Sequence, residues 1–86
     1  MHVQKVNEYV EREKFLMDLE YDFVKELVSL RKDNNLSQQK MADMANVIRD
    51  TIARIENCIV SPQINTLIKI LEPLGYTITI KKIEKN

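Results

Sequence analysis

The chain has 86 residues, with 13 Lys and Arg and 13 Asp and Glu, so its formal net charge is zero. A chain of this length forms one domain with a single small core, and one Cys with one His excludes both a disulfide framework and the residue spacings of a zinc site. No apolar run approaches the ~18 residues of a membrane span, and charges throughout residues 1–19 exclude a secretory signal, so we expect a soluble cytoplasmic protein without a metal, another cofactor or membrane contact.

The charges are unevenly distributed along the chain. Residues 1–30 hold four basic and seven acidic residues, whereas residues 31–86 hold nine basic and six acidic residues. The resulting net charges of −3 and +3 indicate either two surfaces with different partners or two solvated helix faces. A net charge of zero therefore does not exclude nucleic acid as a partner of the basic part.

The first predicted element is a long helix, because apolar residues recur at steps of three and four. The helix is expected to begin near Asn7 or Glu13 and to end at Lys32, before the turn-forming residues 33–35. Its length leaves open a break near residues 17–21. The apolar stripe consists of Leu16, Leu19, Phe23, Leu27 and Leu30. We also assign the aromatic residues of this segment to the core rather than to a ligand pocket: Phe15, Tyr21 and Phe23.

Two short helices follow. Ser37 is expected to cap the first of them, because its hydroxyl can accept a hydrogen bond from a free amide of the next turn, and this helix runs through Met44. A tight turn over residues 45–47 separates the helices, and Asn46 is the residue there that best tolerates a positive φ. The second helix is expected to cover residues 49–57.

A further helix and a strand are predicted for the rest of the chain. Pro62 suits the first position of that helix and Gly75 suits its end, while Pro73 should shorten or kink its last turn. The alternating, β-branched residues 76–83 predict a strand, which needs a partner because an unpaired strand leaves its backbone groups open. We expect pairing with the same strand of a second chain in a homodimer, with residues 2–6 as the alternative partner. The apolar members of this dimer strand are Tyr76, Ile78 and Ile80.

The two short helices and their turn form the arrangement of a helix-turn-helix. Ala42 is small where the helices would cross, and Ile52 is apolar where the second helix would meet the core. Arg49 and Arg54 remain on the outer face of the second helix. Because a helix fits the DNA major groove and Arg is the usual bidentate partner of guanine, we expect these two side chains to contact bases. Asp50 could accept a hydrogen bond from cytosine or orient either arginine.

Residues 36–56, LSQQKMADMANVIRDTIARIE, resemble the helix-turn-helix of the Xre or lambda-repressor-like family, and residues 61–75, SPQINTLIKILEPLG, resemble the helix that follows it. The resemblance implies a bundle that binds double-stranded operator DNA, commonly as a dimer. The expected fold class is all-α, a lambda-repressor-like helix-turn-helix bundle of about five helices, with one C-terminal β-strand paired across a dimer. Three segments are expected: an acidic helical extension over residues 1–30, a helix-turn-helix domain over residues 31–75, and a strand and tail over residues 76–86.

The same resemblance implies roles for single residues. Gln38 corresponds to a position that binds a phosphate, while Thr51 and Asn57 correspond to positions near the DNA backbone. Three residues correspond to positions facing base edges: Arg49, Asp50 and Arg54. Two residues correspond to a structural, buried ion pair: Arg31 and Glu56.

Three positions depart from the family pattern. Ile48 stands where the family usually has a Ser or Thr that caps the second helix, so that helix is expected to begin without its usual cap. Asn46 replaces the turn glycine, and Cys58 replaces another glycine in the loop after Asn57.

Both ends of the chain resemble those of HigA-type antitoxins, which have a helical extension before the motif and a strand such as GYTITIKKI, residues 75–83, after it. This resemblance implies an antitoxin that represses its own operon and neutralises a RelE-like ribonuclease toxin. Because such toxins are basic, the acidic residues 8–26 would face the toxin; a solvated helix face is the alternative.

Other functions are weaker alternatives. A stand-alone Xre-family regulator without a toxin, and a protein-binding antitoxin with weak DNA affinity, fit the same residues. An enzyme is not expected, because catalysis needs reactive groups that converge in a cleft. The one His of this chain lies near its N-terminus, and Cys58 has no His near it in the sequence.

Overall fold

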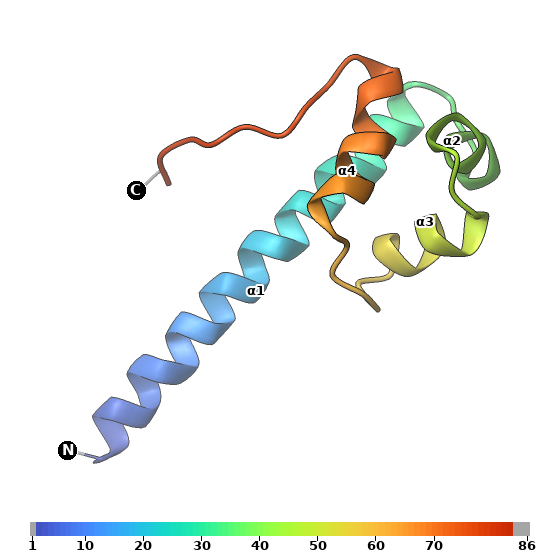
Figure 1. Cartoon of the computed structure of the whole chain (residues 1–86). Coiled ribbons are helices and arrows are strands. Elements are labelled where there is room, and N and C mark those ends of the chain that lie inside the picture. The colour runs from blue at the N-terminus through green and yellow to red at the C-terminus, as the bar shows by residue number, and fades with distance from the viewer. Residues whose placement is uncertain (1, 84–86) are drawn as a thin grey trace.

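The described part of the chain forms a long N-terminal helix, three short helices and a non-helical tail (Figure 1). The computed structural model describes the backbone of residues 2–83 and the side chains of residues 8–83. The helices are α1 (His2–Asp33), α2 (Gln38–Ala45), α3 (Arg49–Glu56) and α4 (Ile64–Leu71), followed by a 3-10 turn, η1 (Glu72–Leu74). The helical, helix-turn-helix fold is confirmed, whereas the described residues contain four α-helices and not about five.

The first helix is continuous over 32 residues, without the break considered near residues 17–21. It contains no Pro or Gly that would interrupt its backbone hydrogen bonds. At ~1.5 Å per residue such a helix is about 48 Å long, close to the longest dimension of the molecule, 52 Å. Because residues 2–6 belong to this helix, the alternative in which they pair as a strand with residues 76–83 is wrong.

Turn chemistry ends α1 and α2 where the sequence predicts. Asn35 has a φ of 56° just after α1, and Asn46 has a φ of 58° at the end of α2. Val47 N donates to Ala42 O across the latter turn at 3.0 Å, which satisfies a carbonyl that the helix end leaves free. Ser37 caps α2, its Oγ accepting a hydrogen bond from Lys40 N at 3.0 Å.

The second half of the chain follows the prediction less closely. α3 begins after Ile48 without a side-chain cap, as expected. α4 begins at Ile64, two residues later than the start predicted from Pro62. Its α-helical part stops at Leu71 and tightens into the 3-10 turn that holds Pro73, since proline has no N–H for an α-helical hydrogen bond.

The core lies where the last turns of α1 meet α2, α3 and α4. Leu27 is 3% exposed and contributes the side of α1, while Ala42, with no exposed surface, lets α2 approach α3 closely. The buried cluster comprises Leu27, Met41, Ala42, Ala45, Ile52, Ile55, Ile70 and Leu71. Every helix therefore contributes to one small core, which fixes α3 relative to the rest of the chain.

The first half of α1 extends beyond this core (Figure 1). The radius of gyration is 15.7 Å, against about 12 Å for a compact domain of this length. Residues 8–22 are all exposed. Phe15 and Tyr21 were expected in the core and are exposed, as are Leu16 and Leu19 of the predicted stripe, because this part of α1 extends beyond the core.

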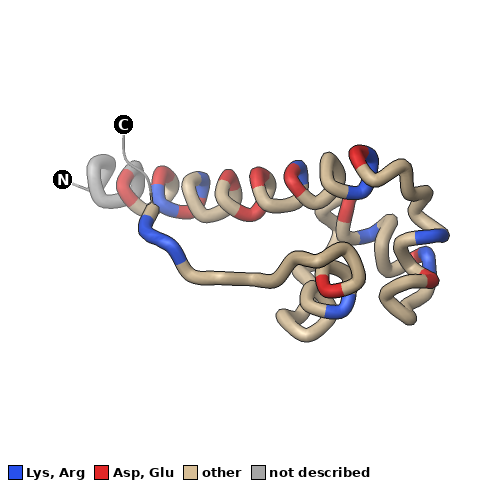
Figure 2. The backbone as a smooth tube through the Cα atoms, turned by 90° about the horizontal axis from the view of Figure 1, so that it is seen from above, with Lys and Arg blue, Asp and Glu red and all other residues tan. Residues whose placement is uncertain are grey.

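Residues 76–83 leave the helices as an exposed segment that runs back in the direction of the start of α1 (Figures 1 and 2). No strand occurs between residues 2 and 83, so the predicted C-terminal strand is not shown in the single chain. A strand is defined by its hydrogen-bonded neighbour, and the described part of one chain offers none. None of the helices in that part is long and apolar enough to span a membrane.

Candidate nucleic-acid interface

The arrangement of α2 and α3 determines which side chains of α3 face outward. α2 packs against both α3 and α4, and α1 packs against α3. Ile52 and Ile55 anchor the inner side of α3, each only 1% exposed. The opposite side of α3 is left open to solvent, with its first turn following directly on the turn at residues 46–48.

Three sequence-predicted residues lie on this open side. Arg49, Asp50 and Arg54 are all exposed. Arg54 Nη1 lies 3.9 Å from Asp50 Oδ2, one helical turn away, in an ion pair whose side chains are both exposed. Among the side chains that the structure describes, Arg49 has no acidic partner, so its guanidinium group is available to a ligand.

The two residues expected near the DNA backbone lie at the edges of this face. Thr51 is half-buried in the first turn of α3. Asn57 is exposed directly after the helix, and its backbone N–H donates to Ala53 O at 3.0 Å. The five residues of this segment that were predicted to contact DNA therefore all lie on α3 or directly after it.

Arg31 and Glu56 form an ion pair that joins α1 to α3. Arg31 Nε donates to Glu56 Oε2 at 2.7 Å, and Arg31 Nη2 donates to Glu56 Oε1 at 3.0 Å. The side chains are only 12% and 7% exposed. Arg31 Nη1 also donates to Leu36 O at 2.8 Å, in the turn before α2. One guanidinium group therefore holds the end of α1, the turn and the last residue of α3 together.

Gln38 adds a third side chain to this network. Its Nε2 donates to Glu56 Oε1 at 2.9 Å. An amide nitrogen carries two hydrogens, so this bond leaves the second N–H of Gln38 for another acceptor at the start of α2. Sequence reasoning placed Gln38 at a phosphate but gave no indication that it also contacts Glu56, because the two residues are 18 positions apart.

The network determines the ionisation of Glu56. Burial raises the pKa of this carboxyl group, but hydrogen bonds from Arg31 and Gln38 and the positive charges of Arg31 and Lys32 outweigh that effect. The pKa of Glu56 therefore lies below its ordinary value, and the residue is ionised at neutral pH. Its contribution to stability is complete above the pKa of an unfolded glutamate and is lost as the pH falls through the lowered pKa.

A second contact that the sequence does not indicate links the middle of α1 to the loop before α4. Ser61 Oγ donates to Glu20 Oε2 at 2.6 Å, across 41 positions of sequence. Both residues are exposed. This single hydrogen bond is a polar link between the long helix and the loop that follows α3.

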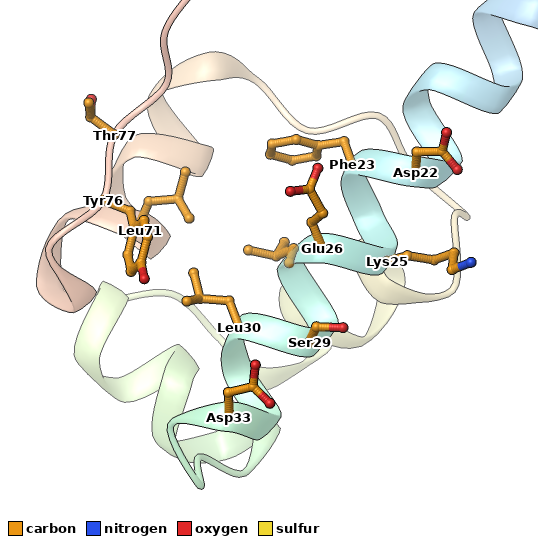
Figure 3. Close-up of a pocket in the computed structure, with 11 residues that line it drawn as sticks. Asp22, Phe23, Lys25, Glu26, Ser29, Leu30, Asp33, Leu71, Tyr76 and Thr77 are labelled. Carbon is orange, nitrogen blue, oxygen red and sulfur yellow. The ribbon is translucent and has the colours of Figure 1, made fainter. Parts of the chain in front are cut away.

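An open groove lies between α1, the end of α4 and the start of the tail (Figure 3). Side chains of α1, among them Phe23 and Leu30, point toward Leu71 and Tyr76 across it. No residue of α2 or α3 lines the groove, so it is separate from the open face of α3. Within the described residues, no group of His, Cys, Asp or Glu could hold a metal ion.

Comparisons with known proteins place these features in context. Residues 27–85 match the protein-family model described as helix-turn-helix. An uncharacterized HTH-type transcriptional regulator of Haemophilus influenzae is 38% identical over 63 residues, which make up 73% of this chain and 64% of that protein. The match thus spans less than two thirds of that relative. A solved chain of a toxin-antitoxin module from Streptococcus pneumoniae is similar with a TM-score of 0.67 and 33% identity, over 85% of this chain and 80% of that chain.

Proposed function

This chain belongs to the helix-turn-helix family, and from that premise we propose that it is a sequence-specific repressor that binds double-stranded operator DNA as a homodimer. The observation that carries the proposal is the open face of α3, where Arg49, Asp50 and Arg54 are exposed while Ile52 and Ile55 hold the helix on the core. In a helix-turn-helix, the second helix lies in the major groove and its first residues contact base edges. The same helix here has two guanidinium groups on its outer side.

Contacts to bases and to phosphates have different roles in this proposal. Arg49 and Arg54 contact guanine, and Asp50 orients Arg54 or accepts a hydrogen bond from cytosine. Gln38 uses its remaining N–H to bind a phosphate, and Thr51 and Asn57 lie beside the backbone. Phosphate contacts fix the position of the protein on the duplex, whereas base contacts provide the sequence preference.

A homodimer would pair the tails of two chains. Tyr76, Ile78 and Ile80 alternate along residues 76–80 and are exposed in the single chain. Pairing these tails about a two-fold axis would complete the backbone hydrogen bonds and cover the apolar side chains. It would also place the two α3 helices about one DNA turn, roughly 34 Å, apart on a near-palindromic operator.

The DNA-binding proposal is tested by changing Arg54→Ala. We expect a loss of about 1–3 kcal/mol in operator binding and a relaxed preference at one base position, because a bidentate base contact is removed. Binding to a complete set of single-base operator variants measures both effects. Arg12→Ala is the matched control, since it removes the same charge from the exposed first half of α1. A uniform loss over all variants would show that Arg54 contacts phosphate instead.

We further propose that the chain is the antitoxin of a type II pair and represses its own operon. The acidic extension, residues 1–30, would bind a basic RelE-like ribonuclease. The helix-turn-helix domain, residues 31–75, would bind the operator. The tail, residues 76–86, would bind the second protomer. Charge supports this division: the acidic positions recur along α1 (Figure 2), seven of them within residues 8–26 against three basic ones. The similar Streptococcus pneumoniae chain, from a toxin-antitoxin module, also supports it.

Deleting residues 1–20 tests the antitoxin proposal. The shortened chain should no longer neutralise the toxin encoded beside it, while it still binds the operator. A full-length double variant, Tyr9→Ser and Met17→Ser, tests the same surface without shortening α1, because both side chains are largely exposed. A neighbouring gene without ribonuclease activity would favour a stand-alone Xre-family regulator, and neutralisation without operator binding would favour a purely protein-binding antitoxin.

A further inference from the structure

Ile48, the residue before α3, neither caps this helix nor packs in the core. Its side chain is 69% exposed, and no side-chain hydrogen bond caps α3. Ser37 occupies the equivalent position before α2 with nearly the same backbone, φ −73° and ψ 164° against φ −81° and ψ 152° for Ile48. Ser37 does form a cap, with Lys40 N. The backbone at Ile48 would therefore accept a capping serine directly.

The missing cap alone indicates little, because α4 also begins without one, after Gln63. What distinguishes Ile48 is an apolar side chain that gains neither a cap nor substantial burial. In natural proteins, positions that break such local rules are often functional or strained sites. Between residues 36 and 57 only one other large apolar side chain is exposed, that of Met44, which at 38% is much less so.

The location of Ile48 points to the bases of DNA. It directly precedes Arg49 and Asp50, two of the exposed residues of α3, and its carbonyl accepts a hydrogen bond from Thr51 N in the first turn at 3.0 Å. The N-terminal residues of a recognition helix lie closest to the base edges. In the major groove, the apolar feature that a base presents is the C5-methyl group of thymine.

We propose that Ile48 is a specificity-determining residue that packs against the C5-methyl group of a thymine in each half of the operator. This inference rests on the proposed DNA binding and extends it to a base pair beside those that Arg49 and Arg54 contact. The Ile48 side chain is exposed to water in the free protein, and packing against that methyl group would bury its apolar surface, which favours binding. A capping serine would stabilise α3 but could not make this contact.

The test begins with DNA duplexes selected from a random library by the wild-type protein. In the selected sequence, each thymine is replaced in turn by deoxyuridine, which removes only the C5-methyl group. Wild-type binding should weaken about fourfold at one thymine per half-site, the effect expected for burial of one methyl group. Ile48→Ala should bind the thymine and deoxyuridine duplexes equally well. Ile64→Ala, which changes another exposed isoleucine outside α3, should retain the fourfold difference.

Ile48→Ser provides the second arm. This variant should gain a helix cap, so its Tm should rise by about 4 °C or more, while its affinity for the selected duplex falls. A residue without a role in DNA binding would give the same rise in Tm with unchanged affinity.

Failure of the inference and failure of the proposed function are distinguishable. The wild-type protein could select a defined duplex and yet bind it equally well with every deoxyuridine replacement, or Ile48→Ser could bind that duplex as tightly as the wild type. Either result would overturn the role of Ile48 and leave DNA binding intact. If the wild-type protein enriched no sequence from the library, the proposed function and this inference would both be wrong.

Discussion

The helical geometry and the apolar pattern are similar along the whole of α1, but only its last third, from residue 23 onward, is packed. Leu27 is 3% exposed in this packed part, whereas Leu19, two turns earlier on the same predicted stripe, is 40% exposed. Met17 and Tyr9 are exposed still further, at 68% and 67%. The periodicity of a sequence thus specifies which face of a helix is apolar, but not whether the same chain covers it.

Polar contacts differ along α1 in the same way. In the packed part, Arg31 uses three nitrogen atoms to hold Glu56 and the carbonyl of Leu36. Further toward the N-terminus of the helix, the ion pair between Lys14 and Asp18 lies in solvent, with side chains 76% and 56% exposed. Exposed ion pairs contribute little to stability because water and salt screen them. Loss of one partner of a buried pair, in contrast, is strongly destabilising because it leaves an uncompensated charge in the interior. Stability should therefore be concentrated around the packed last third of α1.

The largest effect should come from Glu56→Gln. This change leaves the Arg31 guanidinium group largely buried without a carboxylate, and we expect a loss of about 3–5 kcal/mol in the free energy of unfolding. Urea unfolding followed by circular dichroism measures it. Since the pKa of Glu56 is lowered in the folded state, the wild-type protein should also lose stability as the pH falls below the ordinary range of a glutamate. The variant should lack this part of the pH dependence.

Asp18→Asn is the matched control, because it removes a carboxylate from an ion pair in the solvent-exposed part of the same helix. The expected change is about 0.5 kcal/mol or less. Equal losses from the two variants would contradict the concentration of stability in the packed last third of α1.

A somewhat smaller effect is expected from Leu27→Ala, compared with Leu19→Ala. Removing the buried Leu27 side chain should cost about 3 kcal/mol, through lost burial and the cavity that remains. Leu19→Ala should cost about 1 kcal/mol or less in the single chain, because the side chain is already partly in water. If Leu19→Ala proved as destabilising as Leu27→Ala, and more so at higher protein concentration, a second protomer would cover the exposed part of α1 around Leu19.

The same contrast explains how much could be predicted from sequence. Ser37 and Asn46 were predicted with their conformations because a cap or a left-handed turn depends on residues within one helical turn. The exposure of Phe15 and Tyr21 was not predicted, since burial depends on what lies opposite. Residues 76–83 have the pattern of a strand, but a strand requires a neighbour outside the described chain. The contact of Gln38 with Glu56 also depends on packing, which no local pattern specifies.

The smallest expected effect concerns Cys58, in the loop after α3. Its φ is 58°, a left-handed conformation in which a Cβ atom is unfavourable by about 1–2 kcal/mol. Cys58→Gly removes that strain, but glycine loses more backbone entropy on folding, by about 0.5–1 kcal/mol. We expect a net gain of about 0.5 kcal/mol in the free energy of unfolding, measured by urea unfolding under reducing conditions. Cys58→Ala keeps the Cβ atom while removing the exposed thiol, so it should leave stability unchanged. A similar gain in both variants would show that the thiol, and not the backbone conformation, is the source of the effect.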